Sequence, residues 1–170
     1  FVAFLTDALS MGGRSIFLVV IVIWESHFGW SRAELSNLMV LVHCMNGIVT
    51  PLSGHLVDLL PGSIVIGFGI AFLALSFTCV SFIHESWHIW LIYGVMCGSA
   101  YGFLNLNVFV VAVTRAISEA RQGLAVGIAS SGSTAGQLAL VPVFVIVSNI
   151  YGWRNSFLFL GACVWLLLFP

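Results

Sequence analysis

Residues 35–54, LSNLMVLVHCMNGIVTPLSG, form a run of 20 residues without Asp, Glu, Lys or Arg. A helix needs about 20 predominantly apolar residues to cross the hydrocarbon core of a bilayer. The rest of the chain has the same character, because 61% of its 170 residues are apolar and only 6% are charged. A soluble domain has about 45 to 50% apolar and about 25% charged residues. The sequence therefore predicts an all-α integral membrane protein.

Further runs without charge recur along the chain. Residues 64–83, 89–114 and 122–152 contain 20, 26 and 31 such residues. Residues 1–24 are also long enough to span, although Asp7 and Arg14 interrupt them, and residues 155–170 form a last apolar run. We therefore expect one unit over residues 1–170 with six transmembrane helices, at about 1–24, 33–54, 63–83, 88–114, 122–147 and 154–170.

The ends and the charge of the chain limit its partners. The chain starts at Phe1 without an initiator methionine and stops at Pro170 within an apolar run, so we expect it to be part of a longer protein. It has no lysine, five arginines and six acidic residues, which give a net charge of −1. Nucleic-acid binding needs a basic surface. We therefore expect the lipid bilayer, and no nucleic acid, as a partner.

Two short connections resemble each other. Gly29-Trp30-Ser31-Arg32 and Gly152-Trp153-Arg154-Asn155 each place a Trp and an Arg just before an expected helix, and residues 31–34 have the pattern of a capping box. Interfacial anchoring explains the Trp residues. A second interpretation is that helices 1 to 3 and 4 to 6 are internal repeats, as in secondary transporters.

The stretch His84-Glu85-Ser86-Trp87-His88 matches the HExxH pattern of zinc metalloproteases. A helix running unbroken over residues 64–113 would be about 75 Å long, too long for a bilayer, so the chain must turn near the motif. No third zinc ligand lies nearby in the sequence. We expect neither a metal nor a cofactor, and an intramembrane zinc metalloprotease stays an alternative.

A serine protease that used Ser130 as its nucleophile would need a base within hydrogen-bond reach. Helices 5 and 6 contain no histidine to act as that base.

The charges within the first expected span call for a physical explanation. Asp7 and Arg14 are seven residues apart, nearly two helical turns, so they share a face with Thr6, Ser10 and Gly13. A charge at membrane depth costs about 2.5 to 3.5 kcal/mol on insertion scales and usually faces the bundle interior or a water-filled cavity. One interpretation is an internal ion pair of Asp7 with Arg14 that is bridged through neighbours, or an Arg14 side chain that snorkels to the interface. The other is that Arg14 holds an anionic substrate, since its planar fork matches a carboxylate.

Other polar residues fall on helical faces that could complete such a cavity. They are His43, Asn46 and Thr50 on helix 2, Tyr101 and Asn105 on helix 4, and Ser130, Thr134 and Gln137 on helix 5. Ordinary hydrogen bonds between helices would also explain them. Small residues recur at the spacing that lets helices approach closely, namely at Gly94, Gly98, Gly102, Gly123, Gly127, Gly132 and Gly136.

With these features the chain resembles the amino-terminal half of a major facilitator superfamily transporter. Residues 54–62, GHLVDLLPG, are similar to the Gly-x-x-x-Asp-Arg-x-Gly loop between helices 2 and 3 of that family, with Leu59 in place of the arginine. Within the superfamily, the oxalate/formate antiporter and monocarboxylate transporter-like branch is nearest. The stretches that carry this resemblance are residues 28–32 (FGWSR), 51–54 (PLSG), 121–132 (RQGLAVGIASSG) and 152–154 (GWR).

The resemblance implies a twelve-helix fold of two six-helix halves, each a 3+3 inverted repeat, of which the carboxy-terminal half is missing here. It implies that both ends, the loop after helix 2 and the loop after helix 4 are cytoplasmic, and that helices 1 and 4 line a central cavity. Arg14, Asp7, His43, Asn46, Tyr101 and Asn105 are then the candidate substrate-binding residues. Gly54, Asp58, Gly62 and Arg115 are the candidates for a cytoplasmic gate.

These observations lead to one functional expectation. The protein is expected to be a multi-pass carrier of the plasma membrane or bacterial inner membrane, not an enzyme, that moves a small organic anion by alternating access. Arg14 would hold the carboxylate, and Asp7 or His43 would carry a co-transported proton if protons drive the cycle. A non-transporting membrane scaffold shares every helix pattern and differs only in lacking flux.

Overall fold

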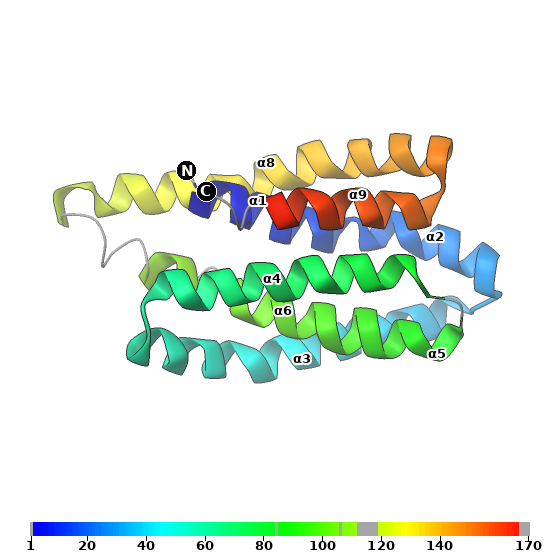
Figure 1. The fold of residues 1–170 in the computed structure, drawn as a ribbon, viewed down its shortest axis with the longest axis horizontal. Helices are drawn as coiled ribbons and strands as arrows, with labels where there is room; N and C mark the ends of the chain where they lie inside the picture. Colours follow the sequence, from blue (N-terminus) through cyan, green and yellow to red (C-terminus); the bar gives the residue numbers. More distant parts are fainter. Residues whose placement is uncertain (1, 84, 106, 112–118, 167–170) are drawn as a thin grey trace.

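A computed structural model of the chain describes residues 2–83, 85–105, 107–111 and 119–166. Every regular element in these ranges is a helix (Figure 1). Five helical segments are long and apolar enough to cross a membrane: Phe4–Phe28, Arg32–Leu59, Gly62–Ser81, Trp87–Val111 and Gln122–Tyr151. A sixth helix, α9 (Trp153–Leu166), has 14 residues within the described part. The predicted all-α membrane class is confirmed.

The first span consists of α1 (Val2–Ser15) and α2 (Phe17–Phe28), which meet at Ile16. The backbone bond from Ile16 N–H to the Gly12 carbonyl, at 3.1 Å, carries the helix through this point. The span ends at Phe28 instead of the predicted Trp24, because Gly29 adopts a left-handed φ of 68° and caps the helix. Glu25 is therefore part of the helix, and it pairs with Arg32 at 3.5 Å.

Helix α3 (Arg32–Leu59) begins with the capping box that the sequence predicts: the Ser31 side chain accepts from Glu34 N–H, and the Glu34 side chain accepts from Ser31 N–H. The helix does not end at Gly54 but continues to Leu59. Only Leu60 and Pro61 separate it from α4 (Gly62–Ser81). The expected loop after helix 2 is therefore wrong in its extent, because the helix ends only at Leu60, whose backbone is extended (φ −121°, ψ 156°) as is favoured before a proline.

The fourth span is interrupted where the sequence predicts one helix over 88–114. It consists of α5 (Ser86–Ile89), the π-helix η1 (Trp90–Cys97) and α6 (Gly98–Phe103), and helix resumes over residues 107–111. At the break, the Asn105 side-chain oxygen accepts from Asn107 N–H at 3.2 Å, and the Asn105 carbonyl accepts from Val108 N–H at 3.0 Å. Asn105 therefore caps a new helix start, a role that asparagine favours.

Helix α8 (Glu119–Tyr151) leads through Gly152 into α9. Gly152 has φ 83°, and its N–H bonds to the Ser148 carbonyl at 3.0 Å. The Gly29 and Gly152 turns thus end their helices in the same way, and both lie at the same end of the bundle (Figure 1).

The helices pack in three main pairs: α1 on α8, α3 on α6 with η1, and α4 on α9. The first span therefore meets the fifth, the second meets the fourth, and the third meets the sixth. If span one is exchanged with span four, two with five and three with six, the same three pairs result. A two-fold relation between two three-helix repeats requires this. The packing agrees with the predicted 3+3 repeat.

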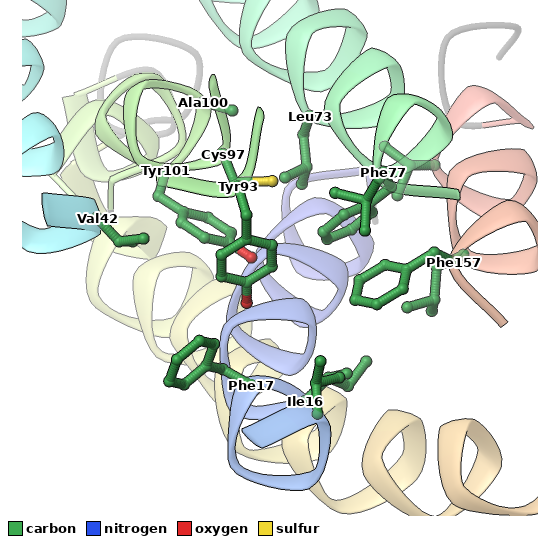
Figure 2. Close-up of a cluster of buried hydrophobic side chains, with 14 of the residues drawn as sticks. Ile16, Phe17, Val42, Leu73, Phe77, Tyr93, Cys97, Ala100, Tyr101 and Phe157 are labelled. Atoms are coloured by element: carbon green, nitrogen blue, oxygen red, sulfur yellow. The ribbon is translucent and has the colours of Figure 1, made fainter. Parts of the chain in front are cut away.

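The buried core joins both repeats. Figure 2 shows Ile16 and Phe17 of the first span below Tyr93 and Cys97 of η1, with Phe77 of α4 and Phe157 of α9 beside them. Large apolar side chains also cover the outside, with exposed fractions of 72% at Leu124 and 75% at Leu138. An outer surface of this kind suits lipid, since soluble monomers rarely expose large continuous apolar patches. The least buried spans are α3 and α8.

Candidate functional site

Helix α1 carries a row of polar side chains on its inner side. Thr6, Asp7 and Ser10 are buried, and Arg14 is half-buried one turn further along. Because seven residues fall about 20° short of two full turns, Asp7 and Arg14 project from the same side of the helix. The predicted polar face of the first span therefore lies within the bundle.

Close packing fixes the position of this face. A Cβ atom at Gly132 or Gly136 of α8 would collide with the backbone oxygen of Phe4 or Ala8, so α1 and α8 touch through their backbones. On another side of α1, a Cβ at Gly13 would lie 2.7 Å from the Phe77 ring and 3.5 Å from the Tyr101 hydroxyl. Glycine at these positions lets α8, α4 and α6 approach the polar face.

Arg14 contacts the aromatic ring of Tyr101. The guanidinium carbon lies 4.8 Å from the ring centroid, within the range of a cation–π interaction. Arg14 Nε is a buried atom without a hydrogen-bond partner among the described residues, whereas the Tyr101 hydroxyl lies near the Tyr93 side chain. The arginine is thus oriented by a ring, while part of its hydrogen-bonding capacity stays unused.

Asp7 is 1% exposed, and neither of its carboxylate oxygens has a hydrogen-bond partner in the described part of the chain. The backbone of Ser133 on α8 lies near enough to act on the carboxylate electrostatically, but the arrangement lacks the geometry of a hydrogen bond. The Ser10 hydroxyl, also buried, is without a partner too. Within the described part of the chain, a direct Asp7–Arg14 ion pair is therefore not present, and a pair bridged through neighbours or a snorkelling Arg14 stays a prediction.

Tyr93 belongs to the same cluster, although it is not among the predicted site residues. In a straight α-helix, eight residues would place Tyr93 and Tyr101 about 80° apart. The intervening π-helix turns less per residue, and both rings are directed toward the first span (Figure 2). Tyr93 stacks on Phe17 with centroids 5.5 Å apart and meets Trp24 edge-on at 5.3 Å. Sequence spacing alone cannot reveal a π-helix, so no pattern indicated this residue.

Asn46, Thr50 and Asn105 are brought together at the interrupted part of the fourth span. Thr50 Oγ1 donates to the Asn46 carbonyl at 2.8 Å, and Asn105 Nδ2 lies 3.4 Å from Thr50 Oγ1. Ser53 Oγ donates to the Gly102 carbonyl at 2.9 Å, which satisfies an acceptor that the break leaves free. These polar residues therefore join α3 to α6 and stabilise the break.

His43 lies on the exposed side of α3, with its Nδ1 2.8 Å from the Met39 carbonyl of its own helix. Further along α3, a pocket of about 250 Å³ opens beside the break in the fourth span. Its lining residues are Thr50, Pro51, Gly54, Val57, Asn107, Val108 and Val111.

The four predicted gate residues lie in different surroundings. Gly54 lines this pocket, Asp58 is exposed in the last turn of α3, and Gly62 is the first residue of α4. Arg115 lies outside the described residues. Asp58 is helical and not part of the predicted loop, and Gly54, predicted as the end of the helix, lies within α3.

The predicted packing glycines fall into two groups. Gly94, Gly98 and Gly102 lie against Leu41, Val42 and Val49 of α3, where a Cβ would approach to between 2.6 and 2.8 Å, while Gly132 and Gly136 lie against α1. At Gly123 and Gly127 a Cβ would meet no described atom within 4 Å. A packing role for these two glycines stays a prediction.

The HExxH stretch lies at the turn between α4 and α5. Glu85 has an extended backbone with φ −106° and ψ 144°, so the motif does not form one continuous helix. His84 lies outside the described residues. Within the described ranges, no group of three His, Cys, Asp or Glu side chains gathers to hold a metal ion.

A comparison with protein families decides the class of the protein. The model of the Major Facilitator Superfamily matches residues 3–169. The chain belongs to the major facilitator superfamily. Membership and the apolar helices make this major facilitator protein a multi-pass membrane protein, as the sequence predicts.

Among curated relatives, this major facilitator chain is similar to proteins named monocarboxylate transporters. It is 29% identical over 150 residues to monocarboxylate transporter 12 of Mus musculus, covering 88% of this chain and 30% of the relative. It is 27% identical over 160 residues to monocarboxylate transporter 13 of Rattus norvegicus, covering 94% of this chain and 37% of the relative. The chain thus spans about a third of the length of these relatives.

Proposed function

We propose that the full-length protein is a secondary transporter that moves a small organic anion, a mono- or dicarboxylate, across a membrane by alternating access. Membership of the major facilitator superfamily and similarity to proteins named monocarboxylate transporters support a carrier of small solutes. The cell membrane, plasma or bacterial inner, is the proposed location. The chain then forms one half of the carrier, and the other half completes the cavity.

One observation supports the charge of the substrate: the guanidinium of Arg14 at membrane depth has an unused Nε–H and no direct ion pair with Asp7. An unpaired charge within a membrane protein usually faces a binding cavity or an ion pathway. A carboxylate can accept two parallel N–H bonds from the planar guanidinium fork. Arg14 is therefore the proposed carboxylate ligand, with Tyr101 beside it.

The remaining predicted site residues take supporting parts in this proposal. Asp7 or His43 carries a proton if the cycle is proton-coupled, and exchange of two anions is the other mode of coupling. Asn46 and Asn105 contribute polar surface near the interrupted fourth span, where irregular backbone in transporters often borders the substrate path.

Gly54, Asp58, Gly62 and Arg115 are the proposed cytoplasmic gate. Replacing Asp58 by alanine in the full-length protein is expected to lower transport strongly, and alanine at the exposed Glu85 serves as the control for loss of an acidic side chain. Near-normal transport by Asp58→Ala would remove Asp58 from the gate.

The alternatives make different predictions. A zinc metalloprotease would hold stoichiometric zinc in the purified full-length protein and would lose it, with activity, on His84→Ala. A scaffold would fold equally well but carry no flux. Family membership does not favour the protease, and the carrier is not expected to be an enzyme.

Counterflow distinguishes the carrier from the scaffold. Full-length protein is reconstituted into liposomes loaded with unlabelled butyrate or succinate, and entry of the labelled anion is followed. The proposal predicts saturable uptake above the level in protein-free liposomes, driven by internal anion if the carrier exchanges anions and by an inward proton gradient if it is proton-coupled. Equal uptake with and without protein, over a panel of mono- and dicarboxylates, would contradict it.

A further inference from the structure

Asp7 lies in the contact between α1 and α8, two helices that run side by side (Figure 1). A Cβ atom at Gly132 would collide with the backbone oxygen of Phe4, three residues before Asp7. A Cβ atom at Gly136 would collide with the backbone oxygen of Ala8, the residue after Asp7. The two helices therefore touch through their backbones on both sides of this acid.

The carboxyl group of Asp7 is closed off from solvent at this contact. Asp7 is 1% exposed, and neither of its oxygens has a hydrogen-bond partner among the described residues. A buried carboxylate is very costly unless a cation or several hydrogen-bond donors compensate its charge, and otherwise it takes up a proton instead. The surroundings of Asp7 thus favour the neutral, protonated side chain.

Among the described residues, no cation compensates a negative charge at Asp7. On α1 itself, Arg14 contacts the Tyr101 ring and forms no ion pair with Asp7. The other titratable groups on the elements packed against α1 are Glu25 and His27 on α2, Glu119, Arg121 and Tyr151 on α8, and Arg154 and Cys163 on α9.

These groups lie elsewhere or supply no positive charge. Those on α2 and α8 are more than ten residues along the chain from the residues at which α1 and α8 touch. Arg154 donates to the Ile83 carbonyl at the opposite turn, and the Cys163 thiol carries no positive charge. Ionised Asp7 would therefore depend on water for its stabilisation.

Hydration of Asp7 requires the helices to part. Water would have to enter where the α1 backbone lies against Gly132 and Gly136, and these glycines bring the two backbones into direct contact. Loss of the proton therefore favours a conformation in which α1 and α8 are separated at this point. Because the closed contact holds a proton that the separated helices release, rising pH favours the separation.

We infer that Asp7 is protonated in this conformation and that the contact between α1 and α8 opens when Asp7 loses its proton. The two helices belong to different three-helix repeats, so the contact is a pH-sensitive joint between the repeats. This inference goes beyond the proposed function, because it selects Asp7 over the exposed His43 and concerns the conformation of the protein with or without flux.

Hydrogen exchange of the full-length protein in lipid nanodiscs tests the inference at about pH 5 and about pH 8, with exchange times scaled to equal intrinsic rates. In the wild type, peptides that contain residues 4–12 and 130–138 are expected to exchange about tenfold or more faster at the higher pH, because each pH unit can shift a one-proton equilibrium tenfold. Asp7→Asn keeps the size of the side chain but has no proton to lose. Its scaled exchange should agree within about twofold at the two pH values.

Two further variants complete the design. Asp7→Ser is a second neutral variant and should behave as Asp7→Asn does, so the assignment does not depend on the folding of one variant. Glu25→Gln removes an acid that is paired with Arg32 at the far end of the first span, and it should keep the pH dependence of the wild type.

The opposite results would overturn the inference. Equal scaled exchange of both helices in the wild type at the two pH values would do so without any variant. A pH dependence that persists in Asp7→Asn and Asp7→Ser would assign the opening to another group, and its loss in His43→Gln would identify that group as His43. None of these measurements involves flux, so their outcome is separate from the uptake experiments that test the proposed function.

Discussion

The guanidinium of Arg14 lies 4.8 Å from the centre of the Tyr101 ring, and this contact joins the first span to the fourth. The two residues come from α1 and α6, which belong to different three-helix repeats. Tyr101 is 1% exposed, so the packing of the bundle holds its ring in place. The ring therefore orients a charge that would otherwise move on a long side chain.

Replacing Tyr101 should show how much this orientation contributes. A cation–π contact contributes about 0.5 to 2 kcal/mol, so Tyr101→Leu is expected to raise the KM for the transported carboxylate by about two- to thirtyfold. Tyr101→Phe retains the ring and should stay within about twofold of the wild type. Phe77→Leu removes a nearby ring that does not face Arg14 and is the control for lost packing. Equal KM values for Tyr101→Leu and Tyr101→Phe would rule out the orienting role.

The contact between α1 and α8 should tolerate no side chain at Gly136. A Cβ there collides with the Ala8 backbone, so Gly136→Ala is expected to destabilise the protein by about 1 to 3 kcal/mol through overpacking. Gly127→Ala on the same helix meets open space and should keep or raise the stability, since alanine favours helix by about 1 kcal/mol over glycine. Thermal unfolding of the full-length variants in detergent measures both. Equal melting temperatures would show that the two backbones do not touch.

The break in the fourth span should depend on Asn105. Asn105→Ala removes the cap of the helix at 107–111 and the contact with Thr50, with an expected loss of about 0.5 to 2 kcal/mol. Asn105→Asp retains the capping oxygen and should recover part of this loss. Asn107→Ala is the control, because it removes only an exposed side chain and leaves the backbone N–H of residue 107 that donates to the Asn105 cap. Its effect on stability should be close to neutral. Thermal unfolding that ranks Asn107→Ala as the most damaging of the three would contradict the capping role.

Arg154 should hold the turn between α4 and α5 in place. Its Nη2 donates to the Ile83 carbonyl at 2.9 Å, and its guanidinium lies 5.0 Å from the centre of a Trp153 ring. Arg154→Gln is expected to destabilise this end of the bundle by about 1 to 3 kcal/mol, because a buried acceptor loses its partner. Arg32→Gln breaks an exposed ion pair and should cost less than about 1 kcal/mol. Hydrogen exchange of the peptide that contains the turn should rise only in Arg154→Gln, and a similar rise in both variants would refute the assignment.

Apolar run length was enough to predict the class of this fold. Runs such as residues 35–54 are long enough to cross the hydrocarbon core of a bilayer, and five helical segments among the described residues are long enough to span it. Composition places the helix ends less well, because a charge does not end a helix. Glu25 and Asp58 are both helical, and the first span ends where Gly29 takes a positive φ.

The site was only partly predictable, for reasons that concern contacts between helices. Helical periodicity placed Asp7 and Arg14 on one face, but it could not decide whether they pair. Asn105 caps a helix in the structure, a role that the sequence did not predict because a cap within an apolar run has no clear pattern. Tyr93 was missed because a π-helix changes the angular spacing of the residues that follow.

Arg14 is the proposed carboxylate ligand, and uptake of labelled butyrate and succinate by liposomes containing full-length wild type, Arg14→Ala, Arg14→Lys or Arg32→Ala tests this role. We predict that Arg14→Ala loses carrier-mediated uptake of whichever of these solutes the wild type transports. Arg14→Lys should recover part of the uptake because lysine restores the charge but not the planar fork, and Arg32→Ala should show normal uptake. Uptake by correctly folded Arg14→Ala that equals the wild type would contradict it.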